Sequence, residues 1–274
     1  MNRSTLSGST SWVLILIYLV IILAPMGWFF TISVKRHVDA IAYPPVFRFE
    51  PIGSNYKELL RESQFSRALA NSAIVGAGSV ALSAIIGIPA AHALSHRKIR
   101  RQRGILMGVL TLRTMPRIVF IVPFFIVLKT LGLTDTRIGL IITYQTFTLP
   151  FFVWTIQPFF EDVSPSLEES ARMDGATPMQ RLLRVVLPVV APGVATTCIL
   201  SFILSWNEFL WALIFTRGKA LTAPVAIMNF MAYEGIAWGK VAAGATLVLI
   251  PAVVFSIISR RYTERSISQG AVKE

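Results

Sequence analysis

The chain has one cysteine, three histidines and only 14 acidic residues among its 274 residues. The single cysteine, Cys198, rules out an internal disulfide framework, and within its apolar run we interpret it as a small packing residue. His37, His92 and His96 show no ligand spacing with acidic residues or with Cys198, so no metal site is expected. The chain also lacks a G-x-x-x-x-G-K-[S/T] phosphate loop and a G-x-S-x-G nucleophile motif, so no catalytic residue is expected.

Charge is scarce as well. Charged residues make up 15% of the chain and hydrophobic residues 54%, with a mean hydropathy of +0.64. This profile excludes an ordinary soluble domain and is typical of a polytopic membrane protein. A net charge of +12 also occurs in nucleic-acid binders. Here the basic residues flank apolar runs instead of forming one stripe, so no nucleic-acid partner is expected.

Long apolar runs are what the chain does contain. About 20 apolar residues cross a hydrocarbon core of about 30 Å, and six runs qualify: 11–34, 69–95, 104–130, 137–159, 191–216 and 240–259. The first is too long for a signal-peptide core and has no cleavage site after it, so we interpret it as an uncleaved span. We therefore predict an all-α polytopic protein with six transmembrane helices, in a single domain over residues 1–274 with a tail at 260–274. Dense basic clusters at 97–103 and at Arg260 and Arg261 favour cytoplasmic termini.

The connection 160–190 is unusually polar and carries helix signals. Ser164 and Pro165 are typical of a helix start, and Gly175 of a helix end. Thr177-Pro178-Met179-Gln180 predicts a capping box that opens a second helix, which we expect to end near Leu187-Pro188. These features alone fit an ordinary loop with interfacial helices equally well.

The spacing within this connection is more specific. Glu169-Ser170-Ala171, three residues, Gly175, nine residues and then Val185-Val186-Leu187-Pro188 resembles the EAA loop of ABC importer permeases. Ser170 replaces the first alanine of that pattern, and Val185 replaces an isoleucine. The stretches ARMDGATP, VVLPVVAPG, LGLTDTRIGLI and SWNEFLWAL, with the ending QGAVKE, are similar to the carbohydrate, maltose-type branch of the family.

The resemblance implies a type I ABC importer permease fold with a cytoplasmic coupling-helix loop at 160–190. It implies a multi-pass subunit in the inner or plasma membrane of a prokaryote, surrounded by lipid and with both termini cytoplasmic. Such a permease translocates a sugar or oligosaccharide that an extracytoplasmic sugar-binding protein or lipoprotein delivers. Its other partners are a second, different permease, which completes a heterodimer, and two copies of an ABC ATPase. The chain itself would be no enzyme and bind no cofactor, since ATP and Mg are used by the ATPase.

Two groups of residues acquire roles from the resemblance. The first would contact the ATPase in the loop: Glu168, Glu169, Ser170, Ala171, Arg172, Met173, Asp174, Gly175 and Ala176. The second is a tail that would reach the ATPase: Gln269, Gly270, Ala271, Val272 and Lys273. A disordered tail is the alternative for the second group.

Polar residues within the spans are candidates for the substrate path, because charges at membrane depth usually face a bundle interior or a watery cavity. Arg113 and Arg117 are four residues apart, which predicts one helical face around Pro116. The other candidates are Trp206, Asn207, Glu208 and Asn229. The alternative is that these groups pair with one another or with the second permease.

Other functions remain open at this point. The two arginines keep open a permease for an anionic solute such as a glycerophosphodiester. A secondary transporter or a polytopic membrane enzyme is the alternative from another class. A secondary transporter often shows internal repeats with broken spans, which we do not find, and neither alternative explains the EAA spacing.

Overall fold

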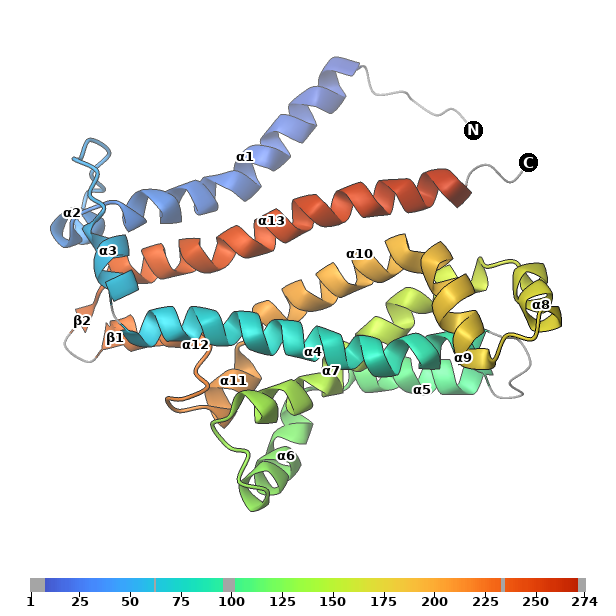
Figure 1. Ribbon diagram of the computed structural model, residues 1–274. Coiled ribbons are helices and arrows are strands. Elements are labelled where there is room, and N and C mark those ends of the chain that lie inside the picture. Colours follow the sequence, from blue (N-terminus) through green and yellow to red (C-terminus); the bar gives the residue numbers. More distant parts are fainter. Residues whose placement is uncertain (1–7, 62, 96–101, 233–234, 271–274) are drawn as a thin grey trace. The chain divides into compact units, whose positions relative to one another are not determined.

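The computed structural model describes residues 8–61, 63–95, 102–232 and 235–270 (Figure 1). The bounds of the helices that precede the EAA loop are α1 (Gly8–Ser33), α2 (His37–Ile41), α3 (Ser54–Arg61), α4 (Ser63–Ser95), α5 (Gln102–Thr114), α6 (Ile118–Thr130) and α7 (Arg137–Glu161). The remaining elements are α8 (Pro165–Met173), α9 (Pro178–Gln180), the π-helical turn η1 (Arg181–Val186), α10 (Leu187–Trp206), α11 (Leu210–Phe215), α12 (Ala223–Ala226), the 3-10 turn η2 (Ile227–Phe230), β1 (Met231–Ala232), β2 (Gly235–Ile236) and α13 (Trp238–Gly270). The prediction of an all-α protein is confirmed, since the described residues contain only one small antiparallel hairpin, β1–β2.

The elements form two compact units. The smaller unit contains Met1–Ser66 and Ala226–Leu249, and the larger contains Arg67–Val225 and Ile250–Glu274. The EAA loop and most of the polar residues within the spans belong to the larger unit.

Each of the six predicted runs is helical, but two of them are interrupted. Among the described residues, five helices are long and apolar enough to cross a membrane, and there are six if the bent pair α5 and α6 counts as one span. The single helix predicted at 104–130 is wrong, because α5 and α6 meet at an angle of 89°. Pro116 explains the bend, since proline lacks an N–H donor and disfavours a helical conformation at the residue before it. The helix predicted at 191–216 is interrupted between Trp206 and Leu210.

The last helix is longer than predicted. We expected a span ending at residue 259 and a tail over 260–274, but α13 continues to Gly270. The sequence contains no proline and no glycine between Ala252 and Gln269, so nothing in it stops the helix once it leaves the apolar stretch. Of the tail residues proposed to contact the ATPase, Gln269 and Gly270 lie in this helix, and Ala271, Val272 and Lys273 lie outside the described residues.

The core of the larger unit lies at the end that carries the EAA loop. There α7 packs against α5 and α10, and the core side chains are Ala91, Leu94, Phe152, Val153, Ile156, Phe160, Leu182, Val186 and Val190. Small residues let these helices approach closely, as is common in membranes. At Gly87 an added Cβ would meet Phe152 at 2.8 Å, and at Gly193 it would meet the Phe159 ring at 2.5 Å. The loop is therefore attached to a tightly packed bundle.

The smaller unit is organised around a buried lysine. The Lys35 ammonium donates to the Val46 carbonyl at 2.7 Å and lies 4.8 Å from the ring centroids of Trp28 and Phe49. Aromatic faces attract cations, so the buried charge has favourable surroundings. Most side chains of α1 are exposed and apolar, which is the surface expected of a span that faces lipid or another membrane chain.

Candidate functional site

The first helix of the EAA loop ends at a sharp glycine turn, as predicted. Gly175 has φ +80°. Its N–H donates to the Arg172 carbonyl at 3.1 Å, and the Ala176 N–H donates to the Ala171 carbonyl at 3.0 Å. This pair of bonds is the Schellman ending, which requires a left-handed residue and therefore favours glycine. At the start of α8 the predicted cap is only partly found, because Ser164 makes no side-chain bond to the backbone.

The second helix of the loop begins as predicted and ends differently. The capping box is present: Thr177 Oγ1 accepts from the Gln180 N–H at 3.3 Å, and Gln180 Oε1 accepts from the Thr177 N–H at 2.9 Å. The predicted end near Leu187-Pro188 is wrong, since α9 continues through η1 into α10. Pro188 lies inside this continuous helix, directly after the π-helical turn η1, where the regular α-helical hydrogen-bond ladder is already interrupted. The loop is thus rigidly continuous with a span.

One face of α8 is tied to the bundle. Glu168 Oε1 lies 3.1 Å from His92 Nε2, which belongs to the end of α4. The His92 ring also packs edge-on against Phe160 of α7, with centroids 5.6 Å apart. Ala171, one turn after Glu168, is buried. These contacts fix the orientation of α8 relative to the ends of two spans.

The opposite face and the tip of the loop are open. Six of the nine residues expected to contact the ATPase are exposed: Glu169, Ser170, Arg172, Met173, Asp174 and Gly175. Met173 is 86% exposed and Met179 is 57% exposed. Exposed methionines with charged neighbours in sequence are suited to a small apolar groove on another protein.

A cavity of about 760 Å³ lies beside α8. It is bounded by the ends of α4 and α7 and by α8 and η1, and its charged lining residues are Glu161, Glu168, Glu169, Arg172 and Arg181, with His92. Charges of both signs therefore line this cavity.

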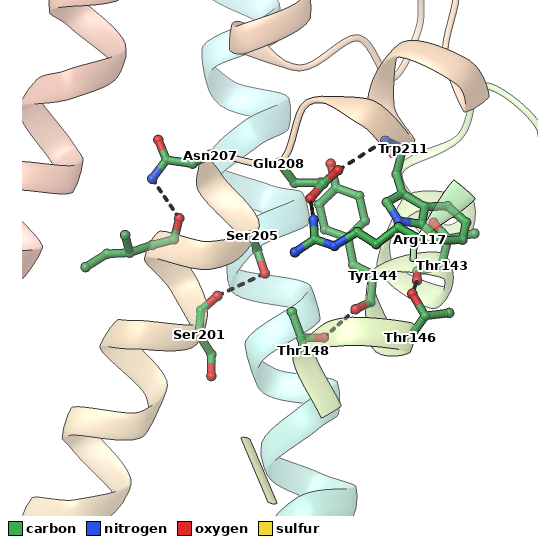
Figure 2. A network of polar contacts seen from close by, with 11 residues as sticks. Arg117, Thr143, Tyr144, Thr146, Thr148, Ser201, Ser205, Asn207, Glu208 and Trp211 are labelled. Atoms are coloured by element: carbon green, nitrogen blue, oxygen red, sulfur yellow. Dashed lines mark hydrogen bonds and ion pairs between the residues drawn. The ribbon is translucent and has the colours of Figure 1, made fainter. Parts of the chain in front are cut away.

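A second polar site lies where the two spans are interrupted (Figure 2). Arg117 follows the bend between α5 and α6, and its guanidinium forms an ion pair with Glu208, which lies in the gap between α10 and α11. The other oxygen of Glu208, Oε1, accepts the backbone N–H of Trp211 at 3.2 Å in the first turn of α11. The side chain of Glu208 is 4% exposed and that of Arg117 is 38% exposed.

The two arginines of span three do not share a helical face, contrary to the prediction, because Arg113 is on α5 and Arg117 follows the bend. Both nevertheless lie over aromatic rings of α7. The Arg117 guanidinium is 4.3 Å from the Phe147 centroid, and the Arg113 guanidinium is 5.1 Å from the Phe151 centroid. These contacts on α7 hold both cations beside the interruption.

The other candidates for the substrate path are more dispersed. Trp206 is buried and stacks on Phe202, with ring centroids 5.7 Å apart. Asn207 is exposed and its amide donates to the Ile203 carbonyl at 2.9 Å, at the end of α10. Asn229 is exposed on η2, in the smaller unit. Of these candidates, the structure thus brings Arg117 and Glu208 together.

A third polar site ties two loops together, and the sequence analysis missed it. Asp135 has φ +54°, and its carboxylate accepts the four backbone N–H groups of residues 217–220 at 3.0–3.2 Å. Burial raises the pKa of Asp135, but these four hydrogen bonds outweigh burial and lower the pKa below its ordinary value. Asn71 adds to the site by accepting from Arg137 Nε at 2.7 Å and donating to the Leu221 carbonyl at 2.8 Å.

His92, Tyr144 and Trp211 are further site residues that the sequence analysis missed. Tyr144, Phe147 and Phe151 follow helical spacing along span four, and this aromatic face was a signal that could have been used. Trp211 is three residues after Glu208, the spacing of a helix cap. His92 has no local signal, because its partner is 76 residues away in sequence.

Comparison with known proteins agrees with the family that the EAA spacing resembles. The family described as "Binding-protein-dependent transport system inner membrane component" matches residues 83–269. The trehalose transport system permease protein SugB of Mycobacterium tuberculosis is 37% identical over 257 residues, which are 92% of each chain. The probable ABC transporter permease protein y4oR of Sinorhizobium fredii is 35% identical over 273 residues, 99% of this chain and 98% of that protein. Among solved structures, a chain of a bacterial ABC transporter involved in the import of the acidic polysaccharide alginate is similar with a TM-score of 0.79. That chain is 26% identical, and the match covers 96% of this chain and 98% of it.

Proposed function

The chain belongs to the family of binding-protein-dependent transport system inner membrane components, and we propose from this premise that its cargo is a sugar or oligosaccharide. It is a multi-pass membrane permease of an ABC importer, a transport subunit and not an enzyme. The relative that transports trehalose supports the proposed class of cargo, because the similarity extends over 92% of both chains. A binding protein outside the membrane would deliver the sugar.

The EAA loop would be the joint with the ATPase. This proposal rests on the open face of α8, where Met173 and Asp174 are exposed beside the rigid turn at Gly175. The other face is fixed to the bundle through Glu168 and Ala171. A helix that is packed on one side and free on the other can pass a rigid-body movement from a docked ATPase to the spans, because packed interfaces do not deform continuously.

Orientation and assembly follow from this role. The loop and both termini would be cytoplasmic, in the membrane of a prokaryote. A second, different permease would complete a heterodimer, and two ATPase copies would bind ATP with Mg. The helical continuation of α13 to Gly270 would carry Gln269 and the residues after it toward the ATPase.

One of the two arginines is already paired within the chain, which weakens the case for an anionic cargo. Arg117 forms an ion pair with Glu208, whereas Arg113 lies over Phe151 and is exposed. We propose that the exposed Arg113 and Asn207 line the substrate path. Arg117, Glu208 and Trp206 would shape the path from behind, and a role for Asn229, in the smaller unit, stays a prediction from the sequence.

Substitution of Met173 tests the coupling role. Because Met173 is 86% exposed, Met173→Lys should leave folding and membrane insertion intact while placing a charge in the contact with the ATPase. We expect the ATPase to be lost from the complex purified in mild detergent, and uptake to be lost with it. Tyr43→Lys is the matched control, since Tyr43 is 97% exposed and follows the first span, which would place it on the side opposite the cytoplasmic N-terminus. Normal recovery of the ATPase with the Met173 variant would contradict the coupling role.

A further inference from the structure

The ion pair between Arg117 and Glu208 has two polar neighbours that make no hydrogen bond. Among the described residues, the Tyr144 hydroxyl and the Trp211 indole nitrogen are buried without a hydrogen-bond partner, and both side chains are 0% exposed. Figure 2 shows the Tyr144 ring pointing toward the ion pair. A buried polar atom without a partner destabilises a fold, and phenylalanine would avoid that cost at position 144. We therefore expect the Tyr144 hydroxyl to have a hydrogen-bond partner in another conformation of the transporter.

The two partners of the ion pair differ in their surroundings. Glu208 is 4% exposed and is held by the Trp211 backbone N–H, whereas Arg117 is 38% exposed and lies at the bend between α5 and α6. Arg117 can therefore move away into more open surroundings when the bend changes. Glu208 cannot follow it, and a buried carboxylate without a partner is strongly destabilising.

Tyr144 is placed to replace Arg117. Its ring lies beside the ion pair (Figure 2), and a phenol is a hydrogen-bond donor to a carboxylate. Tyr144 packs against Phe147, with ring centroids 5.2 Å apart, and the same Phe147 ring lies under the Arg117 guanidinium. Trp211 is less free to adapt, because its indole is stacked at 17° on Phe215 and packed edge-on against Phe124.

We propose that Tyr144 is a substitute partner for Glu208, whose carboxylate accepts the Tyr144 hydroxyl in the transport conformation that Arg117 leaves. The ion pair between Arg117 and Glu208 would thus open without leaving the buried Glu208 carboxylate unpaired. Tyr144 is a positioning residue in this role, since it acts on Glu208 and not on the cargo. This inference rests on the proposed function, in which the spans rearrange during translocation.

The test is Tyr144→Phe in the complete importer, containing both permeases, the ATPase and the binding protein in nanodiscs. The variant removes only the hydroxyl, so the melting temperature of the resting complex should stay the same or rise. We expect ATP turnover stimulated by the binding protein to fall about ten-fold, which corresponds to about 1.4 kcal/mol. In a Glu208→Gln background the Tyr144 substitution should add no further loss, because a neutral amide needs no substitute donor.

Thr197→Val is the matched control, since the Thr197 hydroxyl is also buried without a partner but lies on α10 ahead of the interruption. It should leave turnover unchanged. Normal turnover in Tyr144→Phe, equal losses in both variants, or failure of the Tyr144 variant to assemble would each overturn the proposal. Uptake of radiolabelled trehalose, maltose and diacetylchitobiose is measured separately. If the unmodified importer takes up none of these sugars, the proposed cargo fails, while the ATP turnover of the variants still decides the role of Tyr144.

Discussion

Removal of the Glu168 carboxylate should loosen α8 from the bundle. The side chains of His92 and Glu168 are 17% and 16% exposed, and the atoms that join them are 3.1 Å apart. Hydrogen bonds to a charged group contribute about 1.5–3 kcal/mol, and residual exposure places this contact near the lower value, about 1.5 kcal/mol. Since about 1.4 kcal/mol is a factor of ten, Glu168→Ala should increase local opening of α8 about ten-fold.

Backbone hydrogen exchange measures this opening directly. In the purified complex, amides of residues 168–173 should exchange about ten-fold faster in Glu168→Ala, because local opening limits exchange in a folded protein. Glu169→Ala is the control, since Glu169 is the adjacent glutamate and is exposed. Sugar uptake should fall in Glu168→Ala, as a loosened α8 transmits less movement. Equal exchange rates in the two variants would refute the idea that His92 and Glu168 hold α8 in place.

Three further perturbations follow from the same geometry. Gly175→Val should destabilise the loop by more than about 1–2 kcal/mol, since φ +80° is unfavourable for L-residues and most of all for a β-branched one; thermal unfolding and uptake measure this, and wild-type values for both would contradict it. Because the pKa of Asp135 is lowered from 3.8 in the folded state, its carboxylate stabilises the fold above pH about 4, and this contribution is lost as pH falls through the lowered pKa. Asp135→Asn should therefore lower the melting temperature at pH 7 and remove this acid dependence. If the melting temperatures of the variant and of the unmodified protein changed in parallel with pH, the prediction would be wrong. Arg117→Met should destabilise the protein by less than a fully unpaired buried charge does, which is about 3–5 kcal/mol, because Arg117 is 38% exposed and the Tyr144 hydroxyl can take its place on Glu208. Arg117→Met with Glu208→Met should recover most of the loss, and equal melting temperatures for the single and double variants would show that an unpaired Glu208 costs no stability.

Features with a local cause could be predicted from the sequence. The length of each apolar run fixed the number of spans, because a bilayer demands about 20 residues whatever the remaining fold. The Schellman turn at Gly175 and the capping box at Thr177 and Gln180 depend on residues within one or two turns of each other. For these features, the spacing of the residues along the chain determines which groups meet in space.

Features with a distant cause could not be predicted in this way. The bend at Pro116 has a local cause, but the apolar run from 104 to 130 continues through it, so hydropathy averaged over a window does not detect the bend. The partner of Glu168 is His92, and the partner of Arg117 is Glu208, 91 residues later. Such pairs exist only once helices are packed, and nothing near either residue indicates which distant residue will be its neighbour. Asp135 and the N–H groups of residues 217–220 are joined for the same reason.

The polar residues within the spans and the interruptions of those spans have a common cause. Where a helix stops at membrane depth, backbone groups lose their partners, and each unsatisfied group is costly away from water. Glu208 supplies an acceptor for the Trp211 N–H at the start of α11, and Arg117 then balances the charge of Glu208. Residues that look like a substrate site in the sequence are therefore already required by the backbone around them. A substitution at Glu208 that abolishes transport is consequently no proof of contact with the cargo, and the exposed Arg113 and Asn207 are the better positions for testing that contact.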